Sequence, residues 1–244
     1  MNAHGTAAGA LDIAGAINFR DVGGLPAAGG STRGGVLFRS GNLARLAPAG
    51  IDAVRSLGLR RIIDLRADDE VEHEPTPAGL AATTQRTPLF LGSVASFFTE
   101  DVPLSEMYRR LVDDAADRVV DVVRGIVEEQ PVLVHCTVGK DRTGVTVALA
   151  LAAAGVDEEA VIADYARTES LLPARRNARV VEILSAMHPR ARNIEELATR
   201  SPAPVMRGLL GDLRARFGSP RGYLLAHGLA DDEVDELART LIVR

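Results

Sequence analysis

Short apolar runs alternate with longer stretches of helical periodicity along this 244-residue chain. The runs at 59–65 and 132–135 are rich in Val, Ile and Leu, which is typical of buried strands. Apolar residues recur at helical spacing in 48–57, 104–129 and 144–154, so these stretches predict helices. The alternation predicts an α/β fold with a central, mostly parallel sheet flanked by helices.

The remaining segments complete a single predicted domain over residues 1–244. Residues 1–14 are small and polar, which indicates a flexible tail. The glycine-rich stretch 17–38 predicts short strands joined by turns. We further expect a strand at 83–91, a flexible loop at 92–103, a helix break near 113–114, and helices at 157–168, 173–188, 205–217 and 232–241.

The composition, with 46% hydrophobic and 25% charged residues and a net charge of −5, is that of an ordinary soluble globular protein. We expect no nucleic-acid partner and no stable membrane insertion, since no stretch is long and apolar enough to cross a bilayer. One cysteine excludes an intramolecular disulfide, and the N-terminus lacks the basic and apolar regions of a signal peptide. The expected location is therefore cytoplasmic, with export by a route without a readable signal as the alternative. The sequence does not predict an oligomeric state.

The only cysteine, Cys136, begins the loop between the 132–135 strand and the 144–154 helix. Such a junction exposes the first amides of the helix at the positive end of its dipole, where anions bind and a thiolate is stabilised. Arg142 follows Cys136 with five residues between them, so a loop that curls back places its guanidinium fork beside a phosphate facing the sulfur. The stretch therefore predicts a phosphate-binding loop around a nucleophilic thiolate.

The other loop residues have predicted roles in the same site. Lys140 adds a positive charge, Thr143 can donate its hydroxyl to the sulfur or to the leaving group, and His135 can orient the loop from behind. The predicted phosphate-binding residues are Thr137, Val138, Gly139, Lys140, Asp141 and Arg142.

Two other interpretations of the loop are weaker. A lone cysteine is most often a small buried hydrophobe, but a CxxxxxR loop between a strand and a helix reverses that expectation. The pair Gly139 and Lys140 suggests a nucleotide-binding P-loop, yet that motif requires Gly where Val134 stands and Ser or Thr where Asp141 stands. The nucleotide-binding interpretation therefore fails.

The loop sequence HCTVGKDRTG at 135–144 resembles, without gaps, the HCxxGKDRTG motif of cysteine-dependent tyrosine phosphatases. Within that class it is most similar to the bacterial tyrosine and lipid phosphatases of the mycobacterial PtpB-like family. The resemblance covers roughly residues 15–242. Further segments that look like that family are 17–24, 37–41, 63–66 followed by Glu70, and 218–219 followed by 223–224.

This resemblance implies hydrolysis of phosphomonoesters through a cysteinyl-phosphate intermediate, with no metal and no organic cofactor. Cys136 would attack phosphorus while loop amides and Arg142 hold the equatorial oxygens. Asp141 is the predicted general acid, because the loops of PtpB-like and myotubularin-type phosphatases carry an Asp inside the loop. Asp101, on a predicted loop, and Asp64 are the alternatives, and the absence of Trp excludes the Trp-Pro-Asp acid loop of other relatives.

Two more features lie outside the loop. Asp64 and Arg66 stand at the end of the 59–65 strand, where they either act in catalysis or bond to each other and shape a turn. An arginine-rich segment at 165–200 contains the amphipathic helix predicted at 173–188. The resemblance implies that this segment is a helical lid over the active site. A packed surface helix with solvated arginines is the alternative.

The predicted substrate is a phosphotyrosine-containing protein, with or without dual specificity, and a phosphoinositide is the main alternative. Lys140 beside Arg142 supplies more positive charge than one phosphotyrosine requires, which favours the lipid alternative. A module that binds phosphorylated partners without turnover is a further alternative. It would need a defective loop, whereas Cys136, Arg142 and Asp141 are all present.

Overall fold

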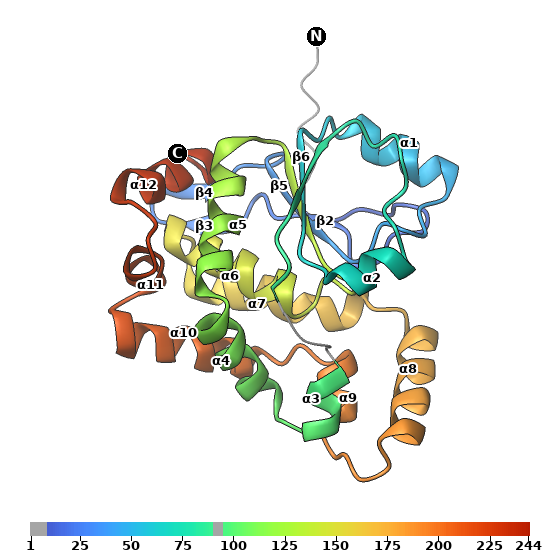
Figure 1. The fold of residues 1–244 in the computed structure, drawn as a ribbon. Helices are drawn as coiled ribbons and strands as arrows, with labels where there is room; N and C mark the ends of the chain where they lie inside the picture. Colours follow the sequence, from blue (N-terminus) through green and yellow to red (C-terminus); the bar gives the residue numbers. More distant parts are fainter. Residues whose placement is uncertain (1–8, 90–94) are drawn as a thin grey trace.

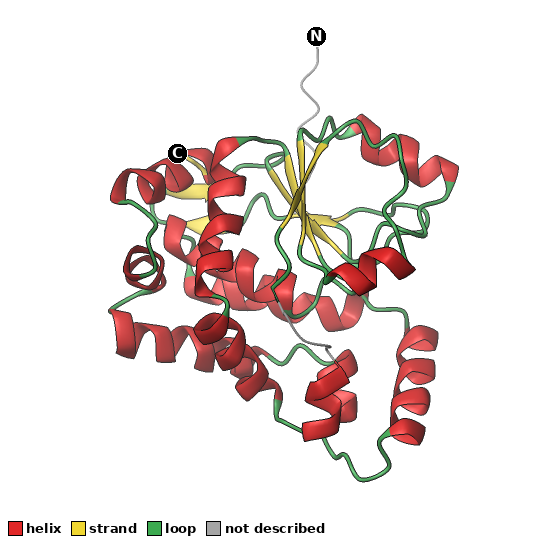
Figure 2. Ribbon diagram, in the orientation of Figure 1, coloured by secondary structure: helices red, strands yellow, loops and turns green. Residues whose placement is uncertain are grey.

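The computed structural model describes residues 9–89 and 95–244, and a six-stranded sheet lies at its centre (Figure 1, Figure 2). In spatial order the strands are β1 (Gly9–Ala10), β2 (Arg20–Asp21), β5 (Leu37–Ser40), β8 (Val132–His135), β6 (Arg61–Asp64) and β7 (Thr83–Arg86). The last four are mutually parallel, and β1 and β2 form an antiparallel addition at one edge. The predicted α/β class with a mostly parallel sheet is confirmed.

The central strands β6 and β8 are buried on both faces, which explains the apolar runs Ile62–Ile63 and Val132–Val134. Successive side chains of a strand point to opposite faces. Ile62 and Leu133 belong to the hydrophobic cluster that includes α1 (Pro48–Ser56). Ile63 and Val134 belong to a larger cluster on the opposite face. The helices of that larger cluster include α4 (Leu104–Asp114), α5 (Ala116–Glu128), α6 (Arg142–Ala154), α7 (Glu158–Leu171), α10 (Ala203–Phe217), α11 (Pro220–Ala226) and α12 (Asp231–Leu241).

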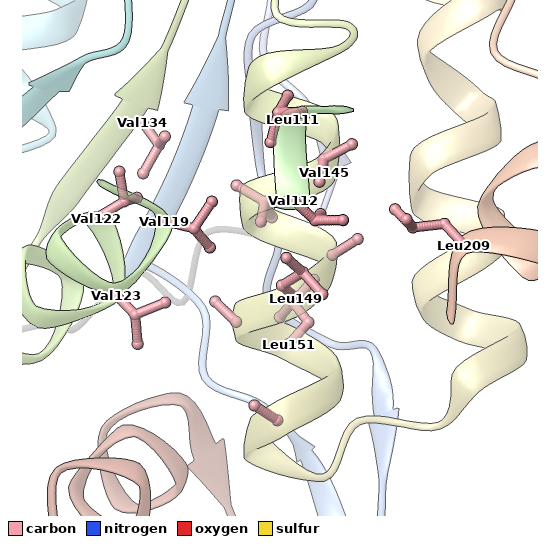
Figure 3. Packing of buried hydrophobic residues seen from close by; sticks show 14 of the residues in the cluster. Leu111, Val112, Val119, Val122, Val123, Val134, Val145, Leu149, Leu151 and Leu209 are labelled. Atoms are coloured by element: carbon pink, nitrogen blue, oxygen red, sulfur yellow. The ribbon is translucent and has the colours of Figure 1, made fainter. Parts of the chain in front are cut away.

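Helix α6 lies in the middle of the larger cluster and is buried along nearly its whole length. A helix enclosed on all sides must be apolar around its circumference, and the sequence RTGVTVALALAAA supplies small apolar residues for close packing. Figure 3 shows Val145 of α6 between Val119 of α5 and Leu209 of α10. The helix ends at Gly155, whose φ of 94° is a left-handed conformation that glycine adopts without strain.

The predicted loop at 92–103 contains helix α3 (Ala95–Glu100), so the prediction is wrong for those residues. Phe97 explains the difference, because its side chain packs into the larger core cluster. A tertiary contact of this kind overrides weak local helix preference. The part of the predicted loop at 92–94 lies outside the described residues.

The predicted tail at 1–14 is wrong for residues 9–14. Gly9 and Ala10 form β1 and pair with β2, and the side chain of Ile13 is buried in the cluster under α1. The part of the predicted tail at 1–8 lies outside the described residues.

The strand predicted at 83–91 is too long, because β7 ends at Arg86 and residues 87–89 form no strand, while residues 90 and 91 lie outside the described residues. Other predicted features agree with the structure. The predicted break near 113–114 is confirmed, because α4 ends at Asp114 and α5 begins at Ala116. The glycine-rich stretch 17–38 does form short strands, of which β3 (Pro26–Ala27) and β4 (Gly30–Thr32) join β9 (Ile242–Val243) in a second, antiparallel sheet. Helix α11 was not predicted.

Two helices after α7 stand away from the sheet, α8 (Ala174–Met187) and α9 (Ile194–Thr199) (Figure 1). Helix α8 confirms the helix predicted at 173–188 and packs beside α9. No residue of α8 is buried, so this helix packs on the rest of the protein only through side chains that stay partly exposed. None of the described helices is long and apolar enough to cross a membrane.

Candidate active site

The loop at 136–141 leaves β8 at the carboxyl edge of the parallel strands and leads directly into α6. The backbone amide of Gly139 donates a hydrogen bond to Cys136 Sγ at 3.2 Å, so the loop curls around the sulfur. Gly139 has a φ of 71°, and a Cβ at this position would lie 2.4 Å from the carbonyl oxygen of Ser40. The curled loop therefore requires glycine at position 139.

The loop lines one side of a cavity of about 240 Å³, here called the reaction pocket. Its lining residues are Glu70, Phe98, Met107, Cys136, Thr137, Val138, Lys140, Asp141, Arg142, Arg176, Val180, Leu184, Leu197 and Ala198. The predicted loop residues thus meet around one space, apart from Gly139, which supports the loop. A larger hollow of about 960 Å³ beside β7 and α5 contains none of the loop residues, so the chemistry around Cys136 defines the candidate site.

Arg142, in the first turn of α6, is held by Glu70 of α2 (Asp68–His73). Its Nη1 and Nη2 atoms donate to the two carboxylate oxygens of Glu70 at 2.5 and 2.8 Å. The hydroxyl of Thr137 also donates to Glu70 and accepts from Arg142 Nη2 at 3.0 Å. Burial alone would raise the pKa of Glu70, but the contacts with Arg142 and Thr137 outweigh it and lower this pKa to about 2. The carboxylate therefore fixes the guanidinium in a defined orientation.

Asp141 lies in the reaction pocket with one carboxylate oxygen held from two sides. Its Oδ1 atom accepts from Lys140 Nζ at 2.6 Å and from the Tyr108 hydroxyl at 2.8 Å. The Tyr108 hydroxyl is also 2.8 Å from the hydroxyl of Tyr165, and both rings are fully buried. Lys140, the only lysine of the chain, makes a second bond to the backbone carbonyl of Arg200 at 2.8 Å. These contacts orient the carboxyl group toward the pocket.

Asp101, the alternative acid, lies elsewhere. Its carboxylate accepts from the backbone amides of Arg192 and Asn193 at 2.8 Å, and it does not line the reaction pocket. The carboxyl group is exposed, and these amide bonds hold its pKa below the usual value. Asp101 therefore ties the end of α3 to the connection between α8 and α9.

Asp64 and Arg66 bond to each other, as the turn-shaping interpretation requires. Arg66 donates to the two oxygens of Asp64 at 2.9 and 2.7 Å, and Arg86 adds a bond of 2.9 Å. Burial would raise the pKa of Asp64, but the bonds from Arg66 and the nearby charges lower it to about 2. An ionised carboxylate buried among arginines is a poor proton donor, and Asp64 does not line the reaction pocket.

His135 and Thr143 are both fully buried behind the loop. The Nδ1 atom of His135 lies 3.4 Å from the carbonyl oxygen of Cys136, and burial lowers the pKa of this histidine to about 4. The hydroxyl of Thr143 has no hydrogen-bond partner among the described residues. The predicted bond from Thr143 to the sulfur is therefore not formed in this structure.

A buried charge network supports the loop from behind. Asn18 Nδ2 and Arg39 Nη2 donate to the carbonyl oxygen of Gly139 at 2.8 and 3.0 Å. Asp164 of α7 accepts from Arg20 Nε at 2.8 Å and from Arg39 Nη1 at 2.7 Å. These side chains are almost inaccessible to solvent. The network links β2, β5 and α7 to the one carbonyl group that defines the curl of the loop.

Sequence reasoning assigned no role to several of these residues. In the sequence, Glu70 was noted only as part of a segment that looks like the family. The one sequence signal for its role in holding Arg142 is its position in an acidic first turn soon after Arg66. Tyr108 and Tyr165 gave no signal, because Tyr108 meets Asp141 and Tyr165 only in the folded chain. Among residues 9–89 and 95–244, no group of three or more His, Cys, Asp or Glu side chains is arranged to hold a metal ion.

Comparison with known proteins defines the class. The model of a tyrosine phosphatase family matches residues 11–243, which is nearly the whole chain. The chain belongs to the tyrosine phosphatase family, and the cysteine-dependent phosphatase predicted from the loop is confirmed as its enzyme class.

Among individual proteins, the chain is similar to the triple specificity protein phosphatase PtpB of Mycobacterium tuberculosis. The two are 30% identical over 95% of this chain and 98% of the relative. A tyrosine-protein phosphatase of Nostoc commune is 29% identical over 82% of this chain and 71% of that protein. The predicted resemblance to the PtpB-like family is therefore confirmed over nearly the whole chain.

Substitution of Asp164 tests the buried network. Asp164→Asn keeps the size of the side chain but leaves Arg20 and Arg39 buried without their counter-charge. We expect the free energy of unfolding, measured by urea denaturation, to fall by about 3–5 kcal/mol. The control Asp12→Asn removes an exposed carboxylate that forms no ion pair with a described residue, and it should change this free energy by less than about 0.5 kcal/mol. Equal stability of the two variants would contradict the role of the network.

The pH dependence of stability tests the Glu70–Arg142 pair. The pKa of Glu70 is about 2 in the folded protein, below its usual value near 4.5. Its contribution to stability is therefore complete above about pH 4.5 and lost as the pH falls toward 2. As the pH falls, the melting temperature of Glu70→Gln should decrease less steeply than that of wild type. The reason is that Glu70 contributes roughly 1–3 kcal/mol to the loss of unfolding free energy at acid pH. Glu72→Gln, which alters an exposed neighbour on α2, should keep the wild-type decline. A decline in Glu70→Gln as steep as in wild type would count against the pair.

Proposed function

We propose that this protein is a protein-tyrosine phosphatase that hydrolyses phosphomonoesters in two steps. The observation that carries the proposal is the curl of the loop around Cys136 Sγ, with Arg142 fixed beside it in the same pocket. In the first step the Cys136 thiolate attacks phosphorus, the S–P bond forms, and the P–O bond to the leaving group breaks. Arg142 and the loop amides hold the equatorial oxygens on which charge develops.

Asp141 is the proposed general acid and base. Its Oδ1 atom is held by Lys140 and Tyr108, which orients the carboxyl group while it donates a proton to the leaving oxygen. In the second step water attacks the cysteinyl phosphate, Asp141 accepts a proton from that water, and the S–P bond breaks. Phosphate leaves and the Cys136 thiolate is restored.

The proposed substrate is a phosphotyrosine-containing protein, with or without dual specificity, and a phosphoinositide is the second candidate. The relative in Mycobacterium tuberculosis is described as a triple specificity phosphatase, which supports a broad substrate range. Lys140, the second cation of the site, is paired with Asp141 at 2.6 Å, so its charge alone does not favour either candidate. Turnover compared on phosphotyrosine peptides, phosphoserine peptides and phosphoinositides decides between the candidates. A module that only binds phosphorylated partners is disfavoured, because the nucleophile, the arginine and the acid share one pocket.

The proposed organisation is a single phosphatase domain that acts in the cytoplasm, with α8 and α9 as a lid. Val180 and Leu184 of α8 and Leu197 of α9 line the reaction pocket opposite the loop residues. Cys136 has only 3% of its surface exposed. A lid that covers the thiolate would limit its oxidation, and it must move to admit a large substrate.

Cys136→Ser should keep the fold and phosphate binding but lose turnover, because a serine hydroxyl is not a resting anion at neutral pH. Arg142→Lys should also be severely impaired, since an ammonium group cannot reproduce the guanidinium fork. Turnover is measured by hydrolysis of a small aryl phosphate, and phosphate affinity is measured separately by calorimetry. Cys136→Ser with near wild-type turnover would end the proposal.

Asp141→Asn should lower kcat by about 10²–10⁴-fold, and the loss should shrink for substrates with better leaving groups. The matched variant Asp101→Asn should lack that leaving-group dependence, because Asp101 lies outside the reaction pocket. A series of aryl phosphates that differ in the leaving-group pKa measures both. The reverse pattern in the two variants would assign the acid to Asp101.

A further inference from the structure

A second cavity lies beside the reaction pocket, and α8 lines one side of it. This groove has a volume of about 620 Å³ and shares Thr137, Val138, Arg176 and Val180 with the reaction pocket. Its other cationic residues are Arg45, Arg175 and Arg179, and its acidic residue is Glu74. Glu74 pairs with Arg45 at 2.7 Å, so the arginines of α8 supply the excess positive charge.

The arginines of α8 differ from those of α4, α10 and α12. Every arginine of α4, α10 and α12 forms an ion pair with a nearby carboxylate. Among the described residues, Arg175 and Arg179 form no ion pair, and Arg176 bonds only to the side chain of Asn177 and to the Ala198 carbonyl. Positive charge therefore remains uncompensated along this side of the groove.

The position of these arginines within the helix is also unfavourable for folding. Arg175 and Arg176 lie in the first turn of α8, which has no acidic residue. Helices α2, α7, α9 and α12 all begin with carboxylates, which suit the positive end of the helix dipole. Two arginines beside the positive end of the dipole disfavour the isolated helix, and an anion bound between them would offset this cost.

The same face of α8 continues into exposed apolar residues. Arg175, Arg179, Ile183 and Met187 are spaced four residues apart, so they form one stripe along the helix. Ile183 has 45% and Met187 65% of its surface exposed, and both are unusually open for large apolar side chains. An acidic peptide would account for the arginines alone. A lipid surface accounts for both halves of the stripe, because its phosphates meet the arginines and its acyl boundary receives the apolar side chains.

We propose that α8 docks the protein on an anionic lipid bilayer, with Arg175 and Arg179 on headgroup phosphates and with Ile183 and Met187 at the acyl boundary. The protein as a whole has a net charge of −5, so attraction to such a surface depends on this local patch. Docking places the groove, and the reaction pocket that opens from it, beside the lipid headgroups. The inference concerns binding and does not depend on the proposed hydrolytic mechanism.

Sedimentation with phosphatidylcholine vesicles, with and without phosphatidylserine, tests the proposal on the full-length protein. We expect binding only to the vesicles with phosphatidylserine, and weaker binding as the salt concentration rises. The double variant Arg175→Gln and Arg179→Gln should bind about 25-fold more weakly, at about 5-fold for each basic residue. The control variant Arg239→Gln and Arg244→Gln removes the same charge from α12 and the C-terminus, and it should bind like wild type.

Met187→Ser should weaken binding at low and at high salt, because it removes an apolar contact rather than a charge. Circular dichroism and hydrolysis of a small aryl phosphate should stay at wild-type level in all these variants, which shows that the fold and the pocket are intact. Equal vesicle binding by the α8 variants and the control variant would overturn the proposal. Absence of vesicle binding together with a loss confined to phosphopeptide turnover in the arginine variant would reassign the groove to a peptide.

Discussion

The shape of the loop around Cys136 depends on one buried carboxylate, that of Asp164. Asp164 holds Arg20 and Arg39 in the interior, and Arg39 in turn binds the carbonyl of Gly139, the residue whose amide faces the sulfur. Burying the guanidinium groups of Arg20 and Arg39 without this carboxylate would strongly destabilise the folded state. The curled loop is therefore coupled energetically to this buried network. The geometry of the loop is therefore a property of the whole sheet and α7, although its residues are consecutive in sequence.

The charges of the site are arranged before a substrate arrives. Glu70 orients Arg142, and Asp141 and the Arg200 carbonyl orient Lys140. Each cation is fixed by an acceptor of the protein, so little reorganisation is needed when phosphoryl oxygens enter. The same acceptors limit the net positive charge of the empty pocket.

The sequence was informative where one local signal decides the structure. The strands around Ile63 and Leu133 were predictable because both faces are buried, and the loop because its motif is continuous and its glycine has no substitute. Helix α3 was not predictable, because it depends on the burial of Phe97. The contacts of Tyr108 with Asp141 and with Tyr165 span 33 and 57 residues, and no spacing rule reveals such pairs. Periodicity indicates which residues are buried, but not which polar groups meet.

The bond from Lys140 to the Arg200 carbonyl has a practical consequence. Arg200 directly follows α9, so an outward movement of that helix would break the bond and bring the amine, now 1% accessible, into solvent. The chain has no second lysine, so an amine-reactive reagent has a single side chain to modify. Its rate of acylation, distinguishable by mass from reaction at the N-terminus, would report how often the segment over the pocket opens.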